Sequence, residues 1–166
     1  MSWKTNGAAL ALALALGTAC GKPVLDAADV RRKVSDAAAA RVGVPVANAA
    51  CPGGIKPAAG ATFTCDVSFQ GGGKLAFSVT QTDAAGALAV APVGDWMLGD
   101  RMETDLATEM FLIGRHDARV DCGDAVMPLA LPGQLECAVT GAPGPARIKV
   151  TVDAQRAVDW SLVGTP

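Results

Sequence analysis

Apolar residues recur along the chain with two different spacings, which predict helices and strands in a repeated order. Two stretches have the spacing of a helix that buries one side. Their apolar positions are Val30, Val34, Ala37 and Ala38 in the first stretch, and Met102, Leu106 and Met110 in the second. Asp26 or Asp29 is placed to cap the first helix, which ends near Gly43. Asp100 followed by Glu103 resembles a capping box at the start of the second helix.

After each helical stretch the apolar positions alternate, as expected for strands that bury one face of a sheet. The alternating positions are Phe63 to Phe69, Leu75 to Val79 and Leu88 to Val90 in the first half, and Leu135 to Val139, Ile148 to Val152 and Val158 to Leu162 in the second. Gly71 to Gly73 are expected to form a turn, and a further short strand is expected at Val44 to Val46. We therefore expect an α+β fold of two tandem repeats, each with one helix packed on a three- to four-stranded antiparallel sheet.

The two halves align with each other at an offset of about 70 residues, which is too long for a solenoid repeat and long enough for a small domain. Cys51 and Cys65 align with Cys122 and Cys137, and the turn at Asp83 aligns with the turn at Asp153. The expected organisation is a signal peptide at 1–19, a lipidated tether at 20–25, repeat 1 at 26–94 and repeat 2 at 95–166.

The N-terminal segment has the layout of a secretory signal. Residues 8–16 are uniformly apolar, follow Lys4, and are too few for a membrane span, which needs roughly 20 residues. The small residues that follow end directly before Cys20. This arrangement resembles a bacterial lipoprotein signal, although Gly17 stands where that family usually has leucine. The resemblance implies that Cys20 carries fatty acyl chains such as palmitate; the alternative is an ordinary signal peptide that leaves Cys20 as a spare thiol.

The other four cysteines are expected to form structural disulfides. Four cysteines allow three connectivities, and the duplication favours one bond within each copy. Closing a loop of about 15 residues stabilises a small domain by roughly 3 kcal/mol. The alternative is a redox or metal site, but no C-x-x-C spacing is present and the single histidine, His116, is close to one cysteine pair only. We therefore expect no metal.

Composition and motifs exclude several classes of function. The formal net charge is −2 and basic residues do not gather on one segment apart from Arg31 to Lys33, so nucleic-acid binding is not expected. We find no phosphate loop, nucleophile elbow or paired carboxylates, and His116 is interpreted as a solvated loop residue. We therefore expect no catalytic residues, no cofactor and no enzymatic activity. Trp96 follows the last strand of repeat 1, where it either seals the contact between repeats or serves as a candidate partner contact.

Two resemblances extend this interpretation. Cys51-Pro52, followed by Gly60, Phe63 and Cys65 in the pattern G-x-x-F-x-C, resembles a small secreted domain of unknown function that is common in actinobacterial envelope lipoproteins. The second copy fits more loosely, because Gly123 follows its first cysteine where the first copy has proline. Two helix-and-sheet repeats that each hold a disulfide also look like the architecture of the β-lactamase inhibitor protein, which binds its enzyme through aromatic residues that are scarce here.

Together these patterns predict a non-enzymatic, lipid-anchored cell-envelope protein with two disulfide-stapled binding modules. The expected partners are the membrane, through the N-terminal lipid, and an unknown envelope protein or cell-wall component. The alternative is a secreted or anchored inhibitor or sensor of another envelope protein.

Overall fold

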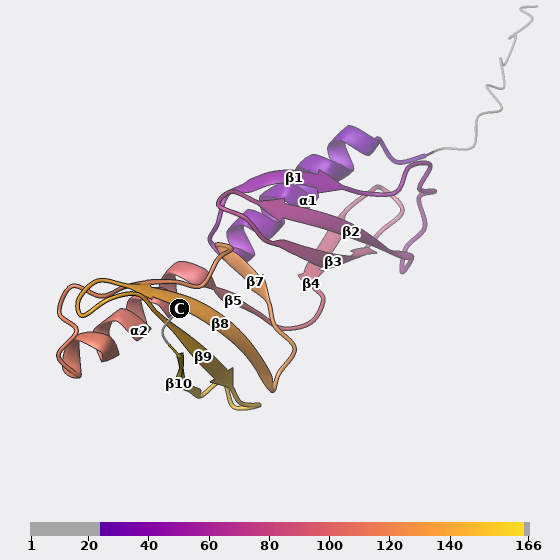
Figure 1. The fold of residues 1–166 in the computed structure, drawn as a ribbon. Coiled ribbons are helices and arrows are strands. Elements are labelled where there is room, and N and C mark those ends of the chain that lie inside the picture. Colours follow the sequence, from indigo (N-terminus) through magenta and orange to yellow (C-terminus); the bar gives the residue numbers. More distant parts are fainter. Residues whose placement is uncertain (1–23, 165–166) are drawn as a thin grey trace, which may run out of the picture.

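The protein is built from two α+β units, each with one helix packed against a four-stranded antiparallel sheet (Figure 1). The computed structural model describes residues 24–164. The fold class expected from the sequence is confirmed. The expected signal peptide and Cys20 lie outside the described residues.

The first unit follows the predicted order of helix and strands. Its elements are α1 (Ala27–Val42), β1 (Val46–Ala50), β2 (Thr62–Phe69), β3 (Lys74–Gln81) and β4 (Leu88–Pro92), and the sheet order is β1-β2-β3-β4. Asp26 caps α1, because its Oδ1 accepts a hydrogen bond from the backbone N–H of Asp29 at 2.7 Å. Gly43 ends the helix in the left-handed conformation, with φ +81°. The strand expected at Val44 to Val46 was placed too early, because β1 begins at Val46 and its remaining residues are three alanines and an asparagine, which show no strand pattern.

The second unit repeats this order. Its elements are α2 (Gly99–Leu112), β6 (Arg119–Asp121), β8 (Gly133–Thr140), β9 (Ala146–Val152) and β10 (Val158–Gly164), and the sheet order is β10-β9-β8-β6. The expected capping box is wrong. The cap position is Leu98, which makes no side-chain cap bond, so Asp100 already lies inside the helix. Glu103 instead accepts a hydrogen bond from the backbone N–H of Cys122 at 2.8 Å, which ties α2 to the loop after β6.

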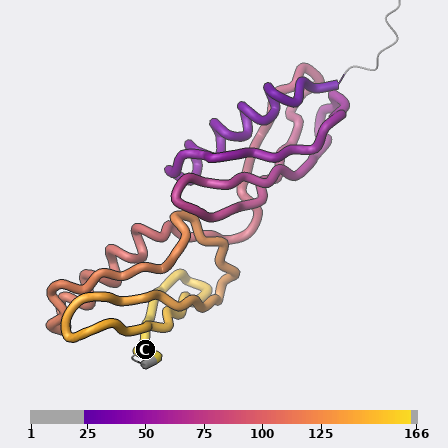
Figure 2. Tube along the Cα trace, turned by 45° about the horizontal axis from the view of Figure 1, so that its top comes forward, coloured from indigo at the N-terminus to yellow at the C-terminus, as the bar shows by residue number. Residues whose placement is uncertain are grey.

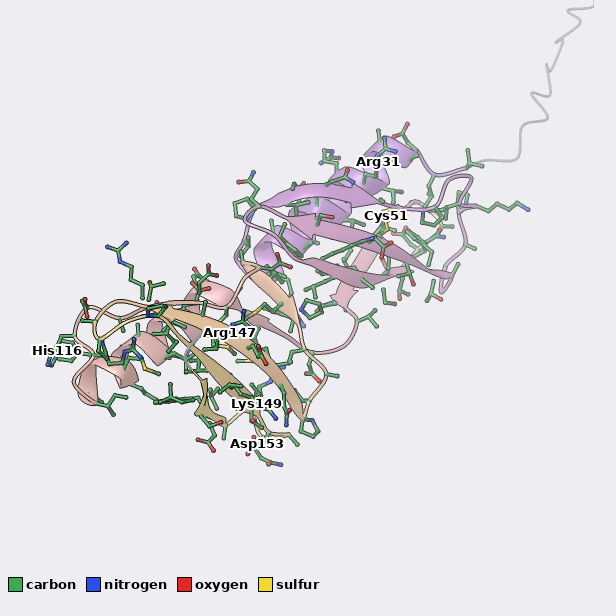
Figure 3. All side chains as sticks on the ribbon, in the orientation of Figure 1. Arg31, Cys51, His116, Arg147, Lys149 and Asp153 are labelled. Atoms are coloured by element: carbon green, nitrogen blue, oxygen red, sulfur yellow. A yellow bond between two sulfur atoms is a disulfide. The ribbon has the colours of Figure 1, made fainter. Side chains whose placement is uncertain are left out.

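Each unit contains one disulfide, Cys51–Cys65 in the first and Cys122–Cys137 in the second. Both bonds join the residue that follows the first strand of a sheet to the second strand of that sheet. Cys65 and Cys137 are buried in the two cores, and the Cys51 disulfide is visible in Figure 3. Each staple therefore fixes a short edge strand to the longer strand beside it.

A small ribbon of two strands, which the sequence pattern did not predict, joins the two units. β5 (Trp96–Leu98) pairs with β7 (Val126–Pro128), with Trp96 opposite Pro128 and Leu98 opposite Val126. Alternate residues of a strand point to opposite faces. On one face Trp96, Leu98 and Val126 pack against the core of the first unit, and on the other face Met97 and Met127 pack against the core of the second. The units consequently lie end to end with the ribbon between them (Figure 2).

The turn expected at Gly71 to Gly73 is present between β2 and β3, and it also contacts the ribbon. Gly71 O accepts a hydrogen bond from the N–H of Ala125 at 3.0 Å, and Gly72 O accepts one from Val126 at 3.4 Å. A Cβ atom on Gly73, which has φ +92°, would lie 1.8 Å from Val126 O. The main chains therefore approach closely because this turn has no side chains.

We predict that Gly73→Ala destabilises the protein by about 1 kcal/mol through its positive φ and by a further ~2 kcal/mol through overlap with Val126. The matched control is Gly54→Ala, since Gly54 has φ +68° and open space around its Cβ position. Urea unfolding of the two variants measures the difference. Equal losses of stability would show that the close approach at Gly73 contributes nothing.

Candidate binding groove

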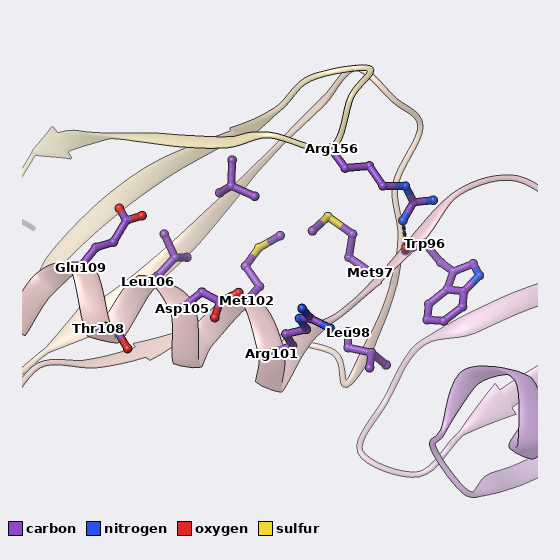
Figure 4. Close-up of a pocket in the computed structure, with 11 residues that line it drawn as sticks. Trp96, Met97, Leu98, Arg101, Met102, Asp105, Leu106, Thr108, Glu109 and Arg156 are labelled. Carbon is purple, nitrogen blue, oxygen red and sulfur yellow. Dashed lines mark hydrogen bonds between the residues drawn. The ribbon is translucent and has the colours of Figure 1, made fainter.

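A groove of about 750 Å³ opens between α2 and the β9–β10 hairpin of the second unit (Figure 4). Its lining residues are Trp96, Met97, Leu98, Arg101, Met102, Asp105, Leu106, Thr108, Glu109, Arg156 and Val158. Its volume is in the range of sites that bind small molecules or side chains of a partner. Trp96 and Arg156 lie at one end of the groove and Glu109 at the other.

The groove has an apolar floor and a charged rim. Met102 and Leu106 of α2 form part of the floor and are 3% and 1% exposed. Val158 of β10 is 41% exposed, although it lies on the sheet face that the helix covers elsewhere. Methionine side chains adapt their shape to irregular surfaces, so a floor that contains Met97 and Met102 suits more than one apolar partner.

The corresponding position in the first unit is closed by a lysine. Lys33 Nζ donates a hydrogen bond to Gly86 O in the β3–β4 turn at 3.0 Å and pairs with Asp29 at 2.9 Å. The repeat alignment places Asp105 at the position of Lys33 and Arg101 at the position of Asp29. A carboxylate cannot donate to a carbonyl, so the second helix has lost the bond that draws the first helix onto its hairpin.

Larger side chains also separate α2 from β10. Trp160 aligns with Val90, and Glu109 aligns with Ala37. Trp160 Nε1 donates a hydrogen bond to Glu109 Oε2, so an indole and a carboxylate stand where the first unit has a valine and an alanine. α1 runs close to β4, whereas α2 approaches β6 and β5. The same fold is therefore closed in the first unit and open in the second.

Arg156 forms the end of the groove from a backbone conformation that non-glycine residues rarely adopt. Its φ is +66°, and it aligns with Gly86, whose φ is +94°. A non-glycine residue pays about 1 kcal/mol or more to occupy this region. The conformation lets the guanidinium reach Asp95 Oδ1 at 2.8 Å and Trp96 O at 3.4 Å. The hairpin of the second unit is thereby tied to the ribbon between the units.

The apolar face of β10 continues beyond the groove. Trp160 and Leu162 pair with Val150 and Ile148 of β9, both of which are buried under α2. Leu162 is nevertheless 61% exposed. Apart from the contact between Glu109 and Trp160, α2 does not cover this strand, so Val158 and Leu162 form an apolar surface that is open to a partner.

The residues singled out from the sequence are distributed over the two units. Trp96 is half-buried. It packs against the first core, which suits a residue that seals the contact between the repeats, and it lines the groove, which suits a partner contact. His116 is exposed in the loop after α2, edge-on to Phe111, at the end of the second unit away from the first (Figure 3). Within residues 24–164 no group of three or more potential metal-ligating side chains comes together.

Sequence reasoning missed the groove, although two signals for it are present in the repeat alignment. One is the charge reversal from Lys33 to Asp105, and the other is Arg156 at a position that the first unit fills with glycine. Each becomes informative only when the contact made by its counterpart in the first unit is known.

Comparison with known proteins identifies one domain. Residues 8–86 match the model of the family described as Domain of unknown function (DUF4333); within the described residues this match covers the first unit through β3 and ends before β4. This confirms the resemblance of the first copy, whereas the second unit lies outside the match. No curated protein and no solved structure matches the chain.

The disulfides indicate a location outside the cytoplasm, where such bonds form and persist. Among the described residues, neither helix has the length and apolar character needed to span a membrane.

The contact between Lys33 and Asp29 in the first unit leads to a prediction about the pKa of Asp29. The hydrogen bond from Lys33, followed by that from Arg32, lowers the pKa of Asp29 below its usual value of 3.8. Because this pKa is lowered by folding, the stabilisation is present above the unfolded value and is lost as the pH falls through the folded one. We expect an NMR titration to find the Asp29 pKa below 3.8 and to find it raised in Lys33→Met. An unchanged Asp29 pKa in that variant would contradict the contact between Lys33 and Asp29.

Proposed function

We propose that the protein is a non-enzymatic, lipid-anchored protein of the cell envelope, and that its second unit binds a partner in the groove between α2 and β10. The observation that carries this proposal is the difference between the repeats: Lys33 closes the first unit, and Asp105 leaves the same place open in the second. Opening it leaves apolar side chains of β10 exposed, which costs stability unless a partner covers them.

The charged groups around the groove support binding in preference to catalysis. Glu109 holds the indole of Trp160, and Arg156 holds Asp95 and the carbonyl of Trp96. These charges therefore shape the walls of the groove. An apolar floor surrounded by a few polar groups is the usual composition of a recognition site.

The anchor is proposed from Cys20 and the apolar segment before it. Each buried methylene of an acyl chain contributes roughly 0.8 kcal/mol to membrane binding, so more than one chain holds the protein at a surface. The disulfides fit this location, because both units require an oxidising compartment to form them.

We predict that cells fed an alkyne-labelled fatty acid incorporate it into the wild-type protein and not into Cys20→Ala. The variant is also expected to leave the membrane fraction. Cys51→Ala/Cys65→Ala is the control, since it removes two cysteines and retains the proposed anchor. Equal labelling of the wild type and Cys20→Ala would exclude lipidation at this position.

A photo-crosslinking amino acid at Val158 tests the binding site. We expect it to form a discrete crosslinked product with another envelope component in intact cells, because Val158 is an exposed apolar residue of the groove. The control position is Lys74, an exposed residue at the start of β3 in the first unit. Identical products from both positions, or no product from Val158, would contradict partner binding in the groove.

A further inference from the structure

Three large apolar residues are exposed at the end of α2, on the side of the second unit that faces away from the first (Figure 1). Phe111, Leu112 and Ile113 are 53%, 78% and 60% exposed, and Leu112 is the most exposed large apolar side chain among the described residues. We call these three residues the apolar tip. Contiguous exposed apolar residues are typical of a surface that contacts another protein or a membrane.

The first unit has small or charged residues at the same place. The repeat alignment that places Met110 on Ala38 carries the apolar tip onto Ala39, Ala40 and Arg41. The helices themselves are equivalent here, since Ala38 and Met110 are both fully buried in their cores. The fold therefore does not require large apolar side chains at the three positions that follow, and their presence in the second unit points to a contact outside the fold.

The geometry of the apolar tip suits a fluid surface better than a flat protein surface. Successive residues of a helix point about 100° apart, so the three side chains spread over an arc of about 200° around the end of α2. A flat and rigid surface touches only part of such an arc. The acyl chains of a lipid layer, in contrast, can surround all three side chains once the helix end enters the layer.

The segment that follows the apolar tip carries a positive charge. Residues 114–119 contain two arginines, one histidine and one aspartate, so their net charge is 2 − 1 = +1, and it rises to +2 when His116 is protonated. The carboxylate of Asp117 is already bound, since it accepts a backbone N–H of the β8–β9 turn at 3.0 Å. Arg119 is exposed, and His116 lies edge-on to the aromatic ring of the tip (Figure 3). This charge is complementary to anionic headgroups.

We propose that the apolar tip inserts into the surface of an anionic lipid layer, with residues 114–119 at the level of the headgroups. Apolar residues that enter such a surface bury in the boundary between headgroups and acyl chains, and basic residues beside them attract anionic lipid. The tip lies at the opposite end of the molecule from the start of the described chain (Figure 2). The inference therefore does not depend on the anchor proposed at Cys20 or on the groove, and it adds a second attachment where that anchor is present.

The variant Leu112→Trp places a fluorescent probe in the apolar tip, and Ala40→Trp places the same probe at the aligned position of the first unit. The full-length variants are mixed with vesicles of equal parts phosphatidylglycerol and phosphatidylcholine whose acyl chains carry bromine, which quenches a nearby indole. We expect quenching beyond that of the wild type for Leu112→Trp and no such increase for Ala40→Trp. With vesicles of phosphatidylcholine alone, we expect the increase to fall at least about fivefold at sub-saturating lipid, because the basic residues lose their attraction to anionic headgroups.

The first unit also supplies a matched variant. Adding Phe111→Ala and Ile113→Arg to Leu112→Trp gives the probe the flanking residues that α1 has at Ala39 and Arg41. This variant is expected to fold, because both positions are exposed and alanine favours a helix. We expect its quenching at sub-saturating lipid to fall about tenfold or more, since two apolar side chains no longer leave water on insertion.

Equal quenching of Leu112→Trp and Ala40→Trp, or undiminished quenching after Phe111→Ala and Ile113→Arg are added, would overturn insertion of the apolar tip. Equal quenching by neutral and anionic vesicles would overturn the preference for anionic lipid. A photo-crosslinking amino acid at Leu112 is expected to give no crosslinked protein in intact cells, and a discrete protein product would assign the tip to a protein partner instead. The Val158 crosslink tests the groove separately, so the two proposals fail independently.

Discussion

The rest of the structure depends on one constraint, which is that a ribbon of two short strands must satisfy two hydrophobic cores at once. β5 and β7 are each three residues long, and alternate side chains enter the first and the second core. Two independent repeats of this size would each be marginally stable, since a small domain buries a small fraction of its surface. By inserting Val126 into the first core and Met127 into the second, the ribbon makes the stability of one unit depend on the other.

This coupling explains how the second unit retains its fold while its helix stands away from β10. In the first unit the bond from Lys33 to the carbonyl of Gly86 closes the helix onto the hairpin. The second unit has other contacts at its ribbon end: Arg156 reaches Asp95, and Gly99 N–H donates to Ala125 O at 2.9 Å. These stabilising contacts of the second unit therefore lie on the side that faces the ribbon and not between α2 and the β9–β10 hairpin. The groove is the space between this helix and this hairpin.

The sequence predicted the regular elements well, because their burial is periodic. Val30 and Val34 lie on the buried side of α1, and Cys65 and Val67 lie on the buried side of β2, as the spacing required. The ribbon was missed because three residues are too few to show a period and because its two faces are both apolar. The capping box was wrong because Glu103 is used by a backbone N–H far along the chain, at Cys122. The groove was missed for a related reason: it results from a lost long-range contact, and a lost contact has no local pattern.

The end-to-end arrangement of the units also has a mechanical consequence. The described chain begins at the end of the first unit that faces away from the second, and β10 lies in the second unit (Figure 2). A force applied to β10 while the start of the chain is held must therefore cross between the units, where the bonds of Gly71 and Gly72 to Ala125 and Val126 lie beside the ribbon. We expect these few main-chain bonds, and the packing of Val126 in the first core, to break before either disulfide-stapled sheet does. The two units would then separate beside the β5–β7 ribbon, while the sheet of each unit stays folded.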